Sequence, residues 1–380
     1  MAVSVDNRRT RTRTALAAVL TVLILVPATI LFASVWGTIS DKRDSTELEK
    51  RGVEYISALA PLVSALAEAQ SSALAGVTAA PGSLGAAVNG VAAVDQRLGI
   101  ELNTRERWTG LRAKIDQLAK ATGNPVTVFE AHVEVTDLAL ALYSSVRNNS
   151  ELVRDPDNDL SHLQQAIGVD LPEAVVQVSR MGDLSQLVAT ADAKVRAQLT
   201  PQFGAAVESV NSAVGDLTDN LQAAVDDTNS VTLSGNLVSG LDSFRRGVES
   251  LTRGANPGGT PNTATMATAQ SQLQTSLSNL SGIVSREMTS LLDERLDGLD
   301  TDTIVALVSA TAAVLLVAAA MVTPLTGTGR RIFVPVPSEA TRDLNVGPTA
   351  PDPGRAEAGT RAPAYGEANP TRREQTGALR

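Results

Sequence analysis

The sequence predicts an all-α protein, and three observations lead to this prediction. Apolar residues make up 43% of the 380 residues, whereas aromatic residues make up only 3%. The apolar content is therefore mostly Ala, Leu and Val, which suits closely packed helices better than a sheet core. Apolar residues also recur at alternating spacings of three and four over residues 40–301, the period of a helix with one buried face. Cysteine is absent, which excludes a disulfide framework and a thiolate metal site.

Two uncharged segments predict membrane spans. Residues 15–36 form a run of 22 residues without a charge, enough to cross about 30 Å of hydrocarbon at ~1.5 Å per residue. Residues 303–322 form a second such run. A cleaved signal peptide is the alternative for the first run, because a basic start and an apolar stretch are common to both. The length of the run and the second span favour an uncleaved anchor, so we expect a two-pass protein of the cell membrane whose first partner is the lipid bilayer.

The charges predict the orientation of the spans. Residues 1–14 hold four Arg and one Asp, residues 324–380 hold eight Arg and six acidic residues, and the remainder holds 20 basic and 34 acidic residues, a net charge of −14. The positive-inside rule therefore places both termini in the cytoplasm and residues 40–301 outside. So acidic a body is not expected to bind nucleic acid, because phosphate binding depends on Lys and Arg.

The body and the tail differ in composition. Residues 324–380 are rich in Pro, Gly, Ala, Thr and Arg, which leaves too little apolar surface to offset chain entropy and predicts a disordered cytoplasmic tail. Residues 40–301 are more than one four-helix bundle needs, so we expect one long helical bundle or two stacked four-helix modules. Its first and last helices continue into the spans, interrupted only by Pro61 and Gly298.

Four polar signals divide the body. Asn124-Pro125 and Thr200-Pro201 each place a capping residue before a Pro at the first helical position, which predicts a helix start at both places. The sequence RDPDND at residues 154–159 predicts a polar break before a new helix. The sequence RGANPGGTPN at residues 253–262 predicts a loop.

Two segments resemble a known family. The sequence EKRGVEYISALAPLVSAL, Glu49 to Leu66, resembles the first extracytoplasmic helix of bacterial chemoreceptors and sensor histidine kinases, which often reads E-R-x-G-V-E-Y followed by a P-L pair. The sequence SELVRDPDNDLSHLQQAI, Ser150 to Ile167, resembles a segment of the same regions that typically reads L-x-x-D-P-D-x-D-S-Y-Y-L-M-D. Together the matches cover about 35 residues. The matching positions are Gly52, Val53, Glu54, Tyr55, Asp155, Pro156, Asp157, Asp159 and Leu163.

This resemblance implies a helical sensory region that forms a homodimer and passes a small helix displacement through the membrane. The paired tyrosines of the family are replaced by Ser161 and His162, so a different ligand, or none, is expected. Relatives continue into a HAMP-type linker and a kinase or signalling helix, whereas residues 324–380 contain no phosphoacceptor His and no nucleotide-binding loop. We therefore expect a separate partner, such as a kinase, to carry the output. The candidate ligand contacts are Tyr55, Asp155, Asp157, Asp159 and His162.

A metal site is not expected at the acidic cluster. Asp155, Asp157 and Asp159 match the first, third and fifth positions of a calcium loop, but the sixth and twelfth positions are Leu160 and Ala166 instead of Gly and Glu. Carboxylates that cap the N-terminus of the next helix are the favoured interpretation.

Other chemistry finds little support in the sequence. The two histidines, His132 and His162, lack carboxylates at ligand spacing, so neither zinc nor another cofactor is expected. No nucleophile elbow accompanies any Ser, and an enzyme is not expected. The leading hypothesis is a two-pass membrane protein with an extracytoplasmic sensor-like module. The alternative is a structural scaffold of the bacterial cell envelope without a ligand, which the Ala, Gly and Ser content of the helices favours.

Overall fold

The computed structural model confirms the all-α prediction for the part of the chain that it describes. Helices and short connections account for all of these residues, and none of them lies in a strand. The predicted tail, 324–380, lies outside the described residues. The structure describes residues 6–322 apart from 78, 119, 122, 154, 229 and 256–260.

Two long helices, α1 (Asp6–Leu74) and α9 (Thr263–Val322), contain the predicted spans and also the first and last parts of the body. Each is long and apolar enough to cross a membrane. Helix α1 continues through Pro27 and Pro61, and α9 continues through Gly298. Apolar side chains in the span regions are exposed, and transfer into lipid would remove this surface from water at roughly 25 cal/mol per Å². Examples are Leu23, Ile30, Leu31, Leu315 and Leu316.

A first group of helices packs on α1. It consists of α2 (Gly82–Leu98), α3 (Arg105–Leu118) and α4 (Pro125–Asn149). The predicted start of α4 is confirmed, because the Asn124 side chain accepts a hydrogen bond from the Thr127 N–H at 2.9 Å and Pro125 is the first helical residue. The predicted stripe of α1 faces this core, with Tyr55, Leu59 and Leu62 fully buried.

A second group packs on α9. It consists of α6 (Leu171–Thr190), α7 (Ala193–Asp227) and α8 (Val231–Ala255). A short helix, α5 (Asn158–Gln165), and a π-helical turn, η1 (Ala166–Asp170), lead from α4 into α6. The predicted break before α5 is therefore confirmed. Residues 256–260 of the predicted loop at 253–262 lie outside the described residues, which show α8 extending to Ala255.

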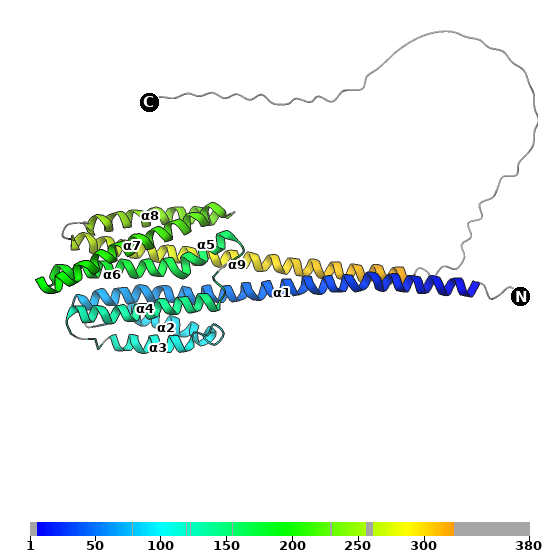
Figure 1. Cartoon of the computed structure of the whole chain (residues 1–380), viewed down its shortest axis with the longest axis horizontal. Coiled ribbons are helices and arrows are strands. Elements are labelled where there is room, and N and C mark those ends of the chain that lie inside the picture. Colours follow the sequence, from blue (N-terminus) through cyan, green and yellow to red (C-terminus); the bar gives the residue numbers. More distant parts are fainter. Residues whose placement is uncertain are drawn as a thin grey trace, which may run out of the picture. The chain divides into compact units, whose positions relative to one another are not determined.

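The two groups lie side by side along the adjacent pair α1 and α9, with one continuous apolar core, and are not stacked end to end (Figure 1). Helices α1 and α9 run next to each other, and both leave the bundle at the same end towards their apolar segments (Figure 1). The first group lies against α1, and in the second group α6 packs against both α9 and α1 (Figure 1).

The predicted helix start at Thr200-Pro201 is wrong. Helix α7 begins at Ala193, where the Asp192 side chain accepts hydrogen bonds from the N–H groups of Lys194 and Val195 at 2.9 and 3.0 Å. The Thr200 hydroxyl donates to the Arg196 carbonyl at 2.8 Å, as a residue inside a helix does. Capping by Asp192 satisfies two N–H groups at once, and Pro201 is accommodated within the helix.

Candidate functional site

The structure distributes the predicted ligand contacts over different interfaces. Tyr55 is buried, and its hydroxyl donates to Asp95 Oδ1 at 2.8 Å, an atom that also accepts from Thr104 at 2.9 Å. Burial raises the pKa of Tyr55. Its side chain thus joins α1 to α2 in the core of the first group, and its hydroxyl proton is already used within the protein.

Asp155 and Asp157 bind Arg295 of α9. The guanidinium donates to both oxygens of Asp155 at 2.5 and 2.9 Å and to Asp157 at 2.7 Å. Asp157 occupies the N-cap position of α5, as predicted, but its side chain accepts no N–H of that helix. These two carboxylates serve an ion pair between elements, which the sequence pattern did not indicate.

Asp159 and His162 face α7 and its end. Asp159 accepts from the Thr228 hydroxyl at 3.0 Å and from the Leu160 N–H at 2.8 Å. His162 lies with Nδ1 3.2 Å from the Asn220 amide oxygen and Nε2 3.8 Å from Asp227 Oδ2. Among the five candidates only Asp155 and Asp157 share a partner. The described residues contain no group of three His, Asp or Glu that could hold a metal ion.

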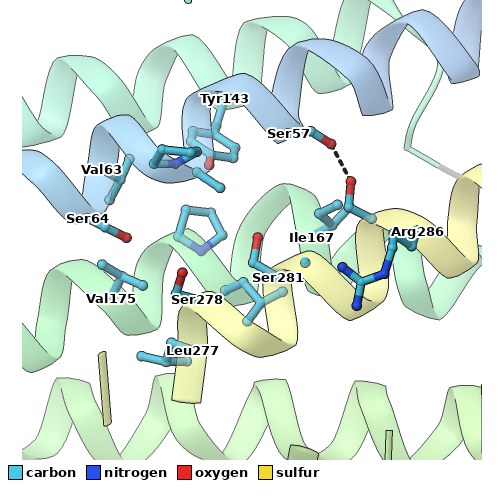
Figure 2. A pocket seen from close by; sticks show the side chains of 16 residues that line it. Ser57, Val63, Ser64, Tyr143, Ile167, Val175, Leu277, Ser278, Ser281 and Arg286 are labelled. Atoms are coloured by element: carbon cyan, nitrogen blue, oxygen red, sulfur yellow. Dashed lines mark hydrogen bonds between the residues drawn. The ribbon is translucent and has the colours of Figure 1, made fainter. Parts of the chain in front are cut away.

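A cavity of about 190 Å³ lies between the two helix groups. Helix α1 provides one wall and α9 provides another, while α4, η1 and α6 close the remaining side. Near this cavity the hydroxyls of Ser57 and Ser285 are in contact and link α1 directly to α9 (Figure 2). The other residues around it are Ala60, Pro61, Val63, Ser64, Tyr143, Ile167, Leu171, Pro172, Val175, Leu277, Ser278, Ser281, Gly282 and Arg286.

The cavity coincides with two irregularities of the helical backbone. Pro61 has no N–H, so the Ser57 carbonyl four residues earlier receives no helical hydrogen bond. Across the cavity the π-helical turn η1 and Pro172 interrupt the regular path from α5 to α6. Such π-turns occur frequently at functional sites. The helix geometry is therefore irregular on both sides of the cavity, at Pro61 in α1 and at η1 and Pro172 opposite it. Such irregularities leave space and free backbone carbonyls, which a ligand could use.

Hydrogen-bond donors without acceptors line this cavity. Tyr143 is only 2% exposed, and burial raises its pKa. Within the described part of the chain its hydroxyl makes no hydrogen bond, and it points into the cavity (Figure 2). Ser278 and Ser281 point from α9 towards α1 and make no hydrogen bond to the described residues (Figure 2). Ser281 is half-buried, whereas Ser278 is exposed to solvent.

Arg286 adds a positive charge at the edge of the cavity. Arg286 is exposed to solvent, and its guanidinium forms no ion pair with any residue that the structure describes, although the body is strongly acidic. Gly282, one turn earlier, leaves space beside it, because a Cβ at that position would lie 3.4 Å from Arg286 Nη1. Hydroxyl and guanidinium groups are donors that suit an oxygen-bearing anion.

Sequence reasoning missed the cavity, although part of the signal was present. Ser278, Ser281 and Ser285 recur at spacings of three and four, so they share one face of α9 that borders its apolar stripe. Pro61 interrupts the predicted stripe of α1. Tyr143, however, lies within an apolar-periodic run and carries no pattern that separates it from an ordinary core residue.

No protein-family model, no curated protein and no solved structure matches this chain. The resemblance of residues 49–66 and 150–167 to sensory regions of chemoreceptors and histidine kinases therefore stays a prediction.

Proposed function

We propose that this protein is a two-pass membrane receptor. Its helical body lies outside the cell, binds a small anion in the cavity between the helix groups, and moves α9 relative to α1. Both termini lie in the cytoplasm, where a separate partner, such as a kinase, reads the displacement. One observation carries the proposal: unpartnered donors line a cavity between the two helices that continue into the apolar segments.

The lining defines the class of ligand. A volume of about 190 Å³ is below the range of about 300–1,000 Å³ typical for drug-sized ligands, so the ligand is small. Tyr143, Ser278, Ser281 and Arg286 supply donors, which favours a carboxylate or an inorganic oxyanion. Ile167 and the apolar side chains beside it cover the opposite wall and would accept a short carbon chain.

The position of the cavity offers a route to the membrane. A ligand that contacts both α1 and α9 has different affinities for two relative positions of these helices, and it shifts the population towards the position that it binds better. Helices pack through discrete contacts, so displacements of about 1–2 Å are typical of such transitions. A homodimer in the membrane would bring two copies of the moving helix pair together for the partner.

The experiment is a thermal-shift screen of the full chain in detergent. Acetate, succinate, phosphate and sulfate are compared with ethylammonium at equal ionic strength. An anion that binds only the folded state raises the melting temperature, by RT ln(1 + [L]/Kd) in free energy. Arg286→Gln and Tyr143→Phe should each remove this shift. Arg253→Gln is the matched control, because Arg253 is an exposed α8 residue that pairs with Glu249.

A rise caused by every anion and retained in Arg286→Gln would contradict a specific site. The alternative function is a structural spacer of the cell envelope. The uninterrupted lengths of α1 and α9, 69 and 60 residues, favour it. A spacer predicts that no compound in the screen changes the melting temperature of the wild-type chain.

A further inference from the structure

The cluster around Arg295 joins three elements at one point. Arg295 of α9 contacts Asp155 and Asp157 of the α4–α5 connection and lies 3.4 Å from Glu49 of α1. The Gln164 amide on α5 lies 3.4 Å from Asp155 Oδ2. The α4–α5 connection links the two helix groups, so the cluster ties both groups and both long helices together.

The charges of this cluster do not balance. Three carboxylates face one guanidinium, and two of them, Glu49 and Asp155, are almost completely buried. If all were ionised, the cluster would have a net charge of −2, which is costly away from water. The bidentate pair satisfies Asp155, and Asp157 is exposed to solvent. Glu49 has the longest contact with Arg295 and is therefore the carboxyl group that gains most from keeping a proton.

Other groups around Glu49 add negative charge. Glu151, also in the α4–α5 connection, interacts repulsively with Glu49, and Arg295 is the cation that opposes this effect. Burial, followed by repulsion from Asp155, raises the pKa of Glu49 to about 8. A proton on this side chain therefore comes off near the pH range in which cells live, whereas an exposed Glu loses its proton at about 4.3.

We propose that Glu49 binds and releases a proton and thereby opens or closes the contact of α1 and α9 with the α4–α5 connection, making the body sensitive to the pH that surrounds it. With the proton bound, the cluster is compact and the two helix groups are held together. Loss of the proton leaves two buried carboxylates on one guanidinium, and repulsion separates Glu49 from Asp155. Glu49 lies 13 residues after the first predicted span and Arg295 lies eight residues before the second, so this separation acts close to the membrane.

The test measures this separation directly in the full chain. The sequence has no cysteine, so Val153→Cys and Gly298→Cys introduce a unique pair of sites for spin labels. Val153 is exposed, and a side chain at Gly298 meets no atom within 4 Å. The distance between the labels should change between pH 6 and pH 10 with a midpoint near 8 in the wild-type background. It should stay at the low-pH value throughout in Glu49→Gln.

Glu47→Gln is the matched control, because Glu47 lies on the same helix and pairs with Arg43 and Arg51 at the surface. It should keep the transition of the wild type. Asp155→Asn removes one source of repulsion and should move the midpoint to lower pH, which tests the idea even if Glu49→Gln does not fold. A distance that is constant in the wild type, or a transition that persists in folded Glu49→Gln, would overturn the proposal. Neither result depends on whether the cavity binds an anion.

Discussion

The two buried tyrosines Tyr55 and Tyr143 differ in whether their hydroxyl forms a hydrogen bond within the protein. The hydroxyl of Tyr55 satisfies Asp95, and both groups are buried. The hydroxyl of Tyr143 has no partner among the described residues and faces the cavity (Figure 2). A buried hydrogen bond contributes about 0.5–1.5 kcal/mol net, and the loss of one partner costs about 1–3 kcal/mol when the other stays buried.

Tyr55→Phe should therefore destabilise the protein by about 1–3 kcal/mol, because Asp95 keeps only Thr104 as a partner. Tyr143→Phe should change the free energy of unfolding by less than about 0.5 kcal/mol, because the lost hydroxyl satisfied no protein group. Denaturant unfolding of the detergent-solubilised chain measures both. Equal losses in the two variants would mean that Tyr143 has an acceptor in the core.

Arg295 gives a second prediction at this scale. Arg295→Gln leaves Asp155 and Glu49 buried without their cation, and breaking a buried pair costs about 3–5 kcal/mol. We expect about 3 kcal/mol at pH 7, the low end of this range, because Glu49 already holds its proton there and only Asp155 is left as a buried charge without its cation. The control Arg253→Gln removes a pair whose side chains are more than 70% exposed and should have almost no effect. A loss below about 1 kcal/mol for Arg295→Gln would show that the cluster does not hold the elements together.

The sequence could not reveal these roles at the residue scale. The sequence makes Tyr55 a ligand candidate, but its hydroxyl donates to Asp95, 40 residues later. The sequence predicts Asp155 and Asp157 as helix caps, but their cation comes from α9, about 140 residues away. Such partners depend on which helices become neighbours, and no local pattern encodes that choice.

At the scale of elements, the approach of α1 to the end of α4 depends on Gly52. A Cβ at this position would overlap the Ser150 side chain and lie 2.8 Å from Leu152 Cδ1. Ser150 and Leu152 are both fully buried just after α4, so neither can move into solvent. This close packing explains physically why a Gly suits this position of the GVEY sequence.

Gly52→Ala should destabilise the protein by about 1–3 kcal/mol, the usual range for overpacking a core. Gly215→Ala is the matched control on α7, where a Cβ meets no atom within 4 Å. There Ala should stabilise the helix by roughly 0.5–1 kcal/mol, because it restricts the unfolded chain. Opposite signs in denaturant unfolding are the expected result, and stabilisation by both substitutions would contradict the close approach of α1.

Helix boundaries were predictable where one cap stood alone. Asn124 before Pro125 begins α4 as expected. Thr200 before Pro201 carries the same signal but lies inside α7, since Asp192 had already capped the helix eight residues earlier. A local start signal can therefore lie inside a helix that begins further upstream. The buried side chains of Leu199 and Phe203 show that the apolar face of α7 continues across this position.

At the scale of the whole helical unit, the all-α fold and the two apolar segments followed from composition and periodicity. The lateral arrangement of the helix groups did not, because it depends on which faces of α1 and α9 meet. The cavity arises from that meeting (Figure 2). It was therefore inaccessible to reasoning that treats one helix at a time.

A receptor for an external anion requires the cavity on the outer side of the membrane and both termini inside. The most direct measurement is labelling of single-cysteine variants, Val153→Cys in the body and Thr349→Cys in the tail, with a membrane-impermeant maleimide. The receptor proposal predicts that the cysteine at position 153 reacts in intact cells and that the one at position 349 reacts only after permeabilisation. Reaction of position 349 in intact cells, or of position 153 only after permeabilisation, would contradict it.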